Sequence, residues 1–325
     1  MDLLKLIKSK VKSFDSTPSE QGVDAVVHHI EISEGHFEQA KSNGEHLYTD
    51  VIYRTNQAFE GALKEAYRIL TGEDPSKKSP YQIEKYFESN NVLKDRVLTQ
   101  FTTYRTEWRN KSTHDYQLFF SSQEAMLAIV SVSAFFNILL DQMIEKQSFE
   151  IEKEKVQRRA KGFFGDGKAY GSMGFMQQVI ELLRLFVEEL NSETQAVTDI
   201  REFELLGRLT GFIVATDPEI EVLTEVPIDY GSGRLRLDML LKKGDGSLII
   251  ELKRPSVQYH RRLREGLEQL KHYLVASKID KGIIFAPSSG VSTKEEYKEY
   301  FIDVPSGELK IAALTPTMLN RVTEK

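Results

Sequence analysis

The sequence predicts a two-domain protein, in which an all-α helical bundle is followed by an α/β domain built on a central mixed sheet. In the first half, apolar residues recur at helical spacing, whereas the second half alternates helical segments with short β-rich ones. Between the halves, residues 146–172 are first highly charged and then rich in glycine, as expected of a helix tail that leads into a linker. We therefore expect one domain over residues 1–160 and a second over residues 173–325.

Four segments of the first half carry a helical pattern. Residues 49–72 open with a Thr-Asp pair and end at a glycine, and residues 79–90 form a shorter helix. Residues 91–114 place one apolar stripe along a helix, whereas residues 121–147 are apolar nearly all round, as in the central helix of a bundle. The stripe consists of Val97, Phe101, Tyr104 and Trp108.

The second half alternates helices with strands. Two adjacent strands are expected to form a hairpin, and a helix separates this hairpin from a further strand. Helix, hairpin, helix and strand in this order form the pattern of an α/β domain. The expected helices are 173–190, 198–210 and 260–276, and the expected strands are 221–230, 234–241, 247–255 and 281–287.

Composition restricts the class of protein. The apolar fraction of 40% and the charged fraction of 28% are ordinary for a globular chain, and the formal net charge of −6 argues against a generally basic nucleic-acid coat. Any contact with nucleic acid is therefore expected to be local. One candidate lies within residues 253–272, for which a solvated helix face is the alternative. Its cations are Lys253, Arg254, Arg261, Arg262, Arg264 and Lys271.

The chain also carries few marks of export or membrane insertion. The absence of cysteine excludes disulfides and thiolate metal sites, and it fits the cytoplasm. The N-terminus lacks the pattern of a cleavable signal peptide. The longest apolar stretch, residues 125–140, is short for a membrane span and predicts a buried core helix. We therefore expect a cytoplasmic protein with no membrane partner.

The β hairpin lies within residues 234–256, which read RLRLDMLLKKGDGSLIIELKRPS. Asp-Gly is a strong signal for a two-residue hairpin turn, so Asp245 and Gly246 are the expected turn residues. With this turn, Gly244 pairs with Ser247, and the register of the whole hairpin follows.

This register brings three charged side chains to one face of the sheet. Asp238 lies opposite Lys253, and Glu251 lies diagonally across from Asp238. Two carboxylates and one ammonium leave a surplus negative charge, which a divalent cation such as Mg²⁺ or Mn²⁺ would neutralise. Spacing alone leaves this metal site and a buried ion pair as alternatives. The opposite face is expected to be filled by Leu237, Met239, Leu248, Ile250 and Leu252.

Asp238, twelve intervening residues and the Glu-Leu-Lys of residues 251–253 resemble the core pattern of the PD-(D/E)XK nuclease superfamily. The resemblance covers about residues 175–300. The proline that often precedes the first acid is replaced by Leu237. The resemblance implies a restriction-endonuclease-like fold and metal-dependent hydrolysis of phosphodiester bonds.

The helix that follows the hairpin extends this resemblance. Gln269 and Tyr273 are similar to the Gln-x3-Tyr motif of the RecB-like branch and of type I restriction subunits. The resemblance implies that Asp238 and Glu251 hold Mg²⁺ or Mn²⁺, and that Lys253 orients or deprotonates the attacking water and neutralises charge. Gln269 and Tyr273 would support the site or touch the phosphate, with ordinary helix packing as the alternative.

A third acid usually comes from the preceding helix. With about 100° per residue, Glu202 falls inside the apolar face of helix 198–210, whereas Glu204 falls outside it. A charged side chain on a buried face is unfavourable unless it has a partner or a function. We therefore favour Glu202 as the acid that completes the water-mediated shell of the metal. Glu204 is the alternative.

The helical half carries a second resemblance. Arg109, Asn110 and His114 resemble the Arg-polar-x3-His motif of the HEPN superfamily, helical bundles that often cleave RNA without a metal. The resemblance covers about residues 45–150, and residues 56–67 are compatible with the companion motif. It implies that His114 moves protons, that Arg109 holds the phosphate, and that Asn110 orients the pair.

The geometry of that motif leaves two arrangements open, of which the HEPN resemblance implies a homodimer. On an unbroken helix, Arg109 and His114 lie about 140° apart and cannot readily share one phosphate. Either the helix breaks near residues 112–113, or two protomers pool their residues, as HEPN relatives do. The alternative is that both residues cap the helix and pair with Glu107 or Asp115, so that this half only dimerises.

Together the two resemblances imply a nuclease of a microbial restriction or anti-phage defence system. The metal-dependent site is the expected main activity, and the HEPN-like half is expected to dimerise or to sense. The alternatives are a metal-independent ribonuclease acting through Arg109 and His114, and a non-catalytic scaffold that binds nucleic acid. The sequence leaves the choice between DNA and RNA open.

Overall fold

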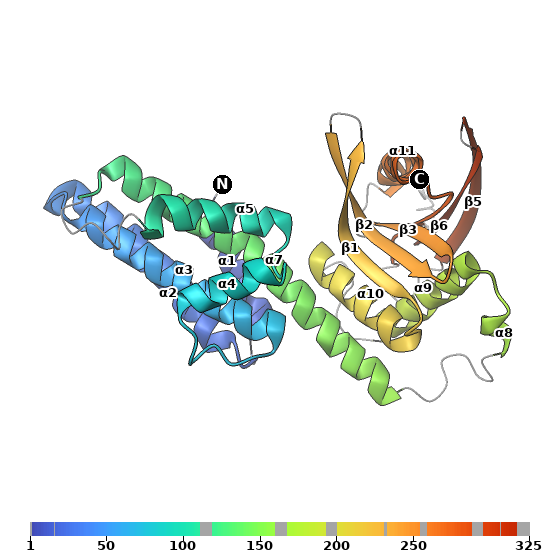
Figure 1. Cartoon of the computed structure of the whole chain (residues 1–325), viewed down its shortest axis with the longest axis horizontal. Helices are drawn as coiled ribbons and strands as arrows, with labels where there is room; N and C mark the ends of the chain where they lie inside the picture. The colour runs from blue at the N-terminus through green and yellow to red at the C-terminus, as the bar shows by residue number, and fades with distance from the viewer. Residues whose placement is uncertain are drawn as a thin grey trace, which may run out of the picture. The chain divides into compact units, whose positions relative to one another are not determined.

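The computed structural model describes residues 2–15, 17–110, 119–159, 168–192, 200–230, 233–253, 259–287, 295–305 and 307–316. The chain divides into two compact units, residues 1–147 and 148–325. The boundary lies inside one long helix, α7 (Ser122–Arg159), which Figure 1 draws in green. The helical pattern therefore continues through the charged part of the segment in which a helix tail and a linker were expected.

The first unit is helical in all of its described elements. Its elements are α1 (Leu3–Val11), the 3₁₀ turn η1 (Lys12–Phe14), α2 (Glu20–Asn43), α3 (Leu47–Thr71), α4 (Pro80–Ser89), α5 (Asp95–Tyr104), the π-helical turn η2 (Arg105–Arg109) and the first part of α7. Local signals explain their ends. Ser79 and Gln82 form a capping box with Pro80 at the start of α4, and Gly72 ends α3 in the left-handed conformation.

An aromatic core joins α3, α5 and α7. The ring of Phe59 stacks on Tyr104 at a centroid distance of 4.6 Å and lies 5.1 Å from Phe135. Val97 and Phe101 of the expected stripe are also fully buried. By length and composition alone α7 could cross a membrane, and 61% of its most apolar window is buried inside the protein.

The second unit is built on a mixed sheet, as the sequence predicts. Its described strands follow the order β1-β2-β3-β4-β6-β5, with β4 parallel to both of its neighbours and the other pairs antiparallel. The strands are β1 (Glu221–Tyr230), β2 (Gly233–Lys243), β3 (Gly246–Leu252), β4 (Lys281–Phe285), β5 (Glu295–Val304) and β6 (Gly307–Pro316). The two last strands had no counterpart among the expected ones.

Helices cover both faces of this sheet (Figure 1). One core lies between the sheet and the helices α9 (Phe175–Asn191) and α10 (Glu202–Thr216), and it contains Phe186, Phe212 and Phe285. A second core lies beneath α11 (Tyr259–Ser277) and contains Leu270 and Leu274. A short helix, α8 (Lys168–Gly171), precedes α9.

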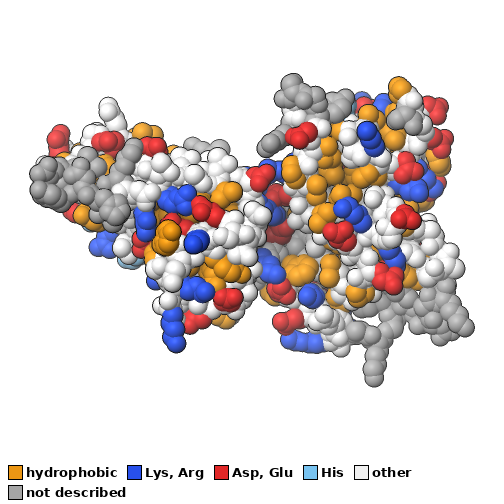
Figure 2. Space-filling model, in the orientation of Figure 1, with side chains coloured by type: hydrophobic (Ala, Val, Ile, Leu, Met, Phe, Trp, Pro, Cys, Tyr) orange, Lys and Arg blue, Asp and Glu red, His pale blue; other side chains and the backbone are white. Residues whose placement is uncertain are grey.

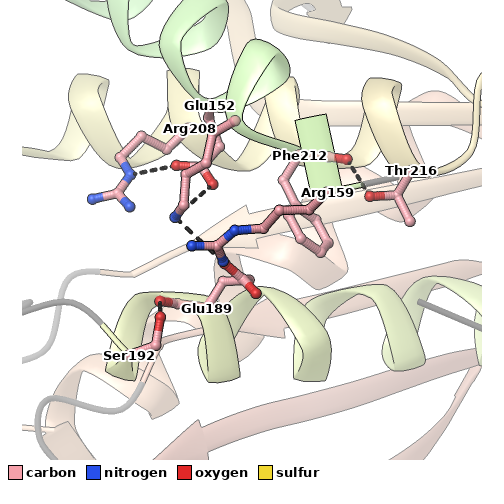
Figure 3. Close-up of polar contacts among 8 residues, drawn as sticks. Glu152, Arg159, Glu189, Ser192, Arg208, Phe212 and Thr216 are labelled. Carbon is pink, nitrogen blue, oxygen red and sulfur yellow. Dashed lines mark hydrogen bonds and ion pairs between the residues drawn. The ribbon is translucent and has the colours of Figure 1, made fainter. Parts of the chain in front are cut away.

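The tail of α7 belongs to the second unit and forms ion pairs with α9 and α10 (Figure 3). Glu152 is buried, and its carboxylate accepts a hydrogen bond of 3.1 Å from Nε of Arg208 on α10. Arg159 pairs with Glu189 of α9. At Gly211 the backbones of α7 and α10 approach so closely that an added Cβ would lie 2.4 Å from a carbonyl oxygen of α7. These contacts make the tail of α7 a structural part of the second unit.

The hairpin of β2 and β3 is confirmed, but its predicted turn is wrong. Lys243 pairs with Gly246, so the turn residues are Gly244 and Asp245, not Asp245 and Gly246. Gly244 has a φ of +55°, as a two-residue hairpin turn with glycine in its first position allows. The register therefore shifts by two residues, and a shift of two does not by itself move a side chain to the other face.

A second correction concerns the face of Leu237. It was expected beside Met239, but it packs in the core beneath α11, whereas Met239 packs against α9 and α10. The β1–β2 ladder is interrupted between the pairs Thr224–Met239 and Val226–Leu237, where Glu225 has a φ of +50°. The alternation of faces changes at this interruption, which lies beside Asp238.

Candidate active site

Asp238 and Glu251 lie next to each other on adjacent strands. The last pair of the β2–β3 ladder is Met239 with Ile250, so continuing the register by one residue places Asp238 opposite Glu251. An Oδ of Asp238 accepts a hydrogen bond of 2.9 Å from the backbone N–H of Leu252. The two carboxyl groups therefore share one face of the sheet, in direct opposition rather than on the expected diagonal.

Lys253 joins this pair from the end of β3. Its backbone N–H donates to the carbonyl of Phe285 at 2.8 Å, which fixes the residue beside β4. Its ammonium donates a hydrogen bond to Oε1 of Glu251 and forms an ion pair with it. The expected contact between the acid pair and the lysine is present, with Glu251 as the partner of Lys253.

One side chain of α11 contacts the ammonium, and a second holds the first in place. Oε1 of Gln269 accepts a hydrogen bond of 3.1 Å from Nζ of Lys253. The amide nitrogen of Gln269 donates to the hydroxyl of Tyr273 at 2.6 Å, which keeps the amide oxygen turned toward the lysine. Gln269 and Tyr273 therefore lie at the site rather than only in the packing of the helix.

Burial shapes the charges of this site. The side chain of Glu251 is 1% exposed and that of Lys253 is 24% exposed. Burial, followed by the charge of Asp238, raises the pKa of Glu251 to about 7 from an ordinary value of 4.5. Burial also raises the pKa of Asp238, against the opposing effects of the Leu252 N–H and of Lys253. Near neutral pH, the pair therefore retains a proton for part of the time.

The placement of the third acid differs from the prediction. Glu202 was expected inside a buried face, but it is exposed because α10 begins at this residue rather than at 198. Its negative charge nevertheless contributes to the raised pKa of Asp238, so it lies within electrostatic range of the site. Glu204 is partly buried. The role of Glu202 in a metal shell stays a prediction.

The donor set at the centre suits a hard divalent cation. Oε2 of Glu251 is buried and accepts no hydrogen bond from any described donor. An oxygen in this state, beside a second carboxylate, is a suitable ligand for Mg²⁺ or Mn²⁺. Among the described residues, no group of three or more His, Cys, Asp or Glu side chains could hold a metal ion together.

Comparisons with known proteins give no family for this chain. No family model, curated protein or solved structure matches it. The chemistry of the site is therefore inferred from its own geometry.

The basic stretch of residues 253–272 is described only in part. Arg264 is exposed and Lys271 is partly buried, whereas Arg254 and the side chains of Arg261 and Arg262 lie outside the described residues. On the face shown in Figure 2, basic and acidic side chains are interspersed.

Of the HEPN-like motif, Arg109 and Asn110 lie among the described residues. His114 lies outside the described residues. Arg109 ends the π-helical turn η2, donates to the side-chain oxygen of Asn110 at 3.2 Å, and lies 3.7 Å from a carboxylate oxygen of Glu60 on α3. Burial raises the pKa of nearby Glu84, and the charge of Arg109 opposes this shift.

The acids expected beside Arg109 were Glu107 and Asp115, whereas Glu60 and Glu84 were not predicted. Glu60 falls within residues 56–67, the segment compatible with the companion motif, so this segment supplies a partner for Arg109. In the same segment, Asn56 accepts a hydrogen bond of 3.0 Å from the hydroxyl of buried Tyr104. The available signal was Glu60, a glutamate inside the segment that is compatible with the companion motif.

Proposed function

We propose that the second unit is a nuclease that hydrolyses phosphodiester bonds with Mg²⁺ or Mn²⁺ held at Asp238 and Glu251. The observation that carries this proposal is Glu251, a fully buried carboxylate beside another carboxylate, with one oxygen bonded to Lys253 and the other without a described donor. The hairpin, the preceding α10 and the following α11 with Gln269 stand in the order of the PD-(D/E)XK pattern that the sequence resembles.

A purely structural role explains this arrangement poorly. A buried carboxylate whose pKa is raised to about 7 destabilises the folded state near neutral pH. Replacing a buried ionic group by an apolar one of similar volume is often neutral or stabilising. The second carboxylate, Asp238, adds to the cost because it repels Glu251. The site is therefore better suited to binding a cation than to stabilising the hairpin.

Each side chain has a defined part in the proposed reaction. Asp238 and Glu251 would bind the cation through their carboxylate oxygens. A bound Mg²⁺ supplies a Lewis acid for the phosphate and lowers the pKa of a bound water. Lys253 would neutralise negative charge that develops on the phosphate, and Gln269 would hold its ammonium in place. Glu202, at the exposed start of α10, could contact water in the outer shell.

Direct measurement of metal binding tests this assignment. In calorimetric titrations of the full chain near neutral pH, the wild type is expected to bind Mn²⁺, and Asp238→Asn and Glu251→Gln are expected to weaken binding by more than about tenfold. Glu268→Gln, at an exposed position of α11, is the matched control and should bind as the wild type does. Unchanged affinity in both site variants would refute the assignment.

For the helical unit we propose dimerisation or sensing, with metal-independent RNA cleavage as the second candidate. The observation that favours the second candidate is Arg109, which ends a π-helical turn, a feature often found at functional sites. Its neighbour Asn110 accepts a hydrogen bond from it, as expected of a pair that orients a phosphate.

The two resemblances together support a role for the protein in a restriction or anti-phage defence system.

A further inference from the structure

Gly266 is a glycine in the interior of the 19-residue helix α11. Glycine is less favourable than alanine in such a position, because it loses more conformational freedom on folding. The residue is buried, so a feature of its surroundings has to explain why a side chain is absent there. A glycine within a helical pattern often has a packing or functional reason.

The space beside Gly266 is filled by Lys253. A Cβ added at this position would lie 3.2 Å from Cε of Lys253. Its other neighbours are two carbon atoms of Ile284 at 3.7 and 3.9 Å, which is ordinary van der Waals contact. Among these neighbours, the crowded contact is therefore the one with Lys253.

Gly266 also shares a helix face with the two polar residues of the site. Gln269 lies three residues later and Tyr273 seven residues later, so all three lie on one face of the helix. Gln269 binds the ammonium of Lys253, whereas Gly266 leaves room for the aliphatic stem that carries it. The helix thus contacts the end of the lysine side chain at two adjacent atoms, Cε and Nζ.

We propose that Gly266 is a positioning residue, whose missing side chain lets Lys253 lie against α11 with its ammonium between Glu251 and Gln269. A larger residue would push the stem away from the helix and shift the ammonium. The consequence for catalysis rests on the proposed nuclease function, whereas the steric relation between Gly266 and Lys253 does not.

Thermal unfolding tests the steric relation in a way that needs neither metal nor substrate. Gly266→Ala is made in the wild type and in a Lys253→Ala background. Alanine favours the helix in both, but it crowds the lysine only in the first. The Tm change is therefore expected to be more favourable in the Lys253→Ala background, by about 2 °C or more. Equal changes in both backgrounds would overturn the proposal.

Gly282→Ala provides the matched control. A Cβ at Gly282 of β4 would meet the side chain of Leu270 on α11 at 3.0 Å, so this variant disturbs the packing of the same helix without approaching Lys253. Its Tm change should be the same with and without Lys253. A coupling to Lys253 as large as that of Gly266 would show a general effect of α11 packing and would also overturn the proposal.

Cleavage kinetics test the catalytic consequence. With Mg²⁺ and plasmid DNA or single-stranded RNA, Gly266→Ala is expected to lower kcat by about tenfold or more with little change in KM, because a small displacement of a catalytic group is costly. Gly282→Ala should retain the wild-type kcat. A normal kcat in Gly266→Ala would overturn the catalytic role, whereas absence of cleavage by the wild type would refute the nuclease proposal and leave the thermal test decisive for Gly266.

Discussion

Replacing Lys253 by alanine is expected to lower the rate of Mg²⁺-dependent cleavage by about 10³-fold. In the structure, its ammonium is the described cation that contacts the acid pair, through Oε1 of Glu251. Without it, the charge that develops on the phosphate would be neutralised less well. The loss of an ion-pair partner also leaves Glu251 buried beside Asp238, so the carboxyl group would hold its proton more tightly.

The measurement is an initial-rate assay at saturating Mg²⁺, with folding checked by circular dichroism. Lys281→Ala is the matched control, because Lys281 lies at the start of β4 with an exposed side chain and does not contact the acid pair. This control should retain the wild-type rate. Undiminished cleavage by Lys253→Ala would remove this lysine from the reaction.

The metal-free protein is expected to lose stability as the pH rises from about 4.5 to about 7, because of Glu251. In the unfolded chain, this carboxyl group loses its proton near its ordinary pKa of 4.5, whereas in the folded chain burial raises the pKa to about 7. Between these values the unfolded state binds fewer protons than the folded state, so the free energy of unfolding falls with pH. The total loss is about 3 kcal/mol.

Urea unfolding in the presence of EDTA measures this loss at several pH values. Glu251→Gln carries no ionisable group at this position, so its stability should fall less over the same window, and it should exceed the wild type at about pH 8. Glu268→Gln, at an exposed position, should follow the wild type. Parallel curves for the wild type and Glu251→Gln would contradict the raised pKa.

The hairpin illustrates how much of the sheet could be predicted from the sequence. Its strands and the common face of Asp238 and Glu251 follow from alternation, which a register error of two residues does not disturb. The turn itself was ambiguous, because Asp245 stands between two glycines and either of them can pair with it in a two-residue turn. The structure uses Gly244, and this choice depends on the strands that flank the hairpin.

Glu202 and Leu237 show why the remainder could not be predicted. Glu202 was expected on the buried face of a helix that starts at 198, but it is the first residue of α10 and is exposed, and helix ends are poorly marked in sequence. The face of Leu237 changed because the ladder is interrupted at Glu225, whose positive φ no pattern predicts for a glutamate. A glycine within a helical pattern marks position 266 in the sequence. Only the fold shows that Lys253 is the side chain that occupies the space beside it.

Cleavage of duplex DNA and single-stranded RNA by the full chain, with Mg²⁺ and with EDTA, tests the proposed metal-dependent hydrolysis most directly. Cleavage that requires Mg²⁺, stops in EDTA and is lost in Asp238→Asn is the expected result. Cleavage of RNA that persists in EDTA and is lost in Arg109→Ala would instead place the activity in the helical unit. No cleavage of either substrate under any condition would contradict the nuclease proposal.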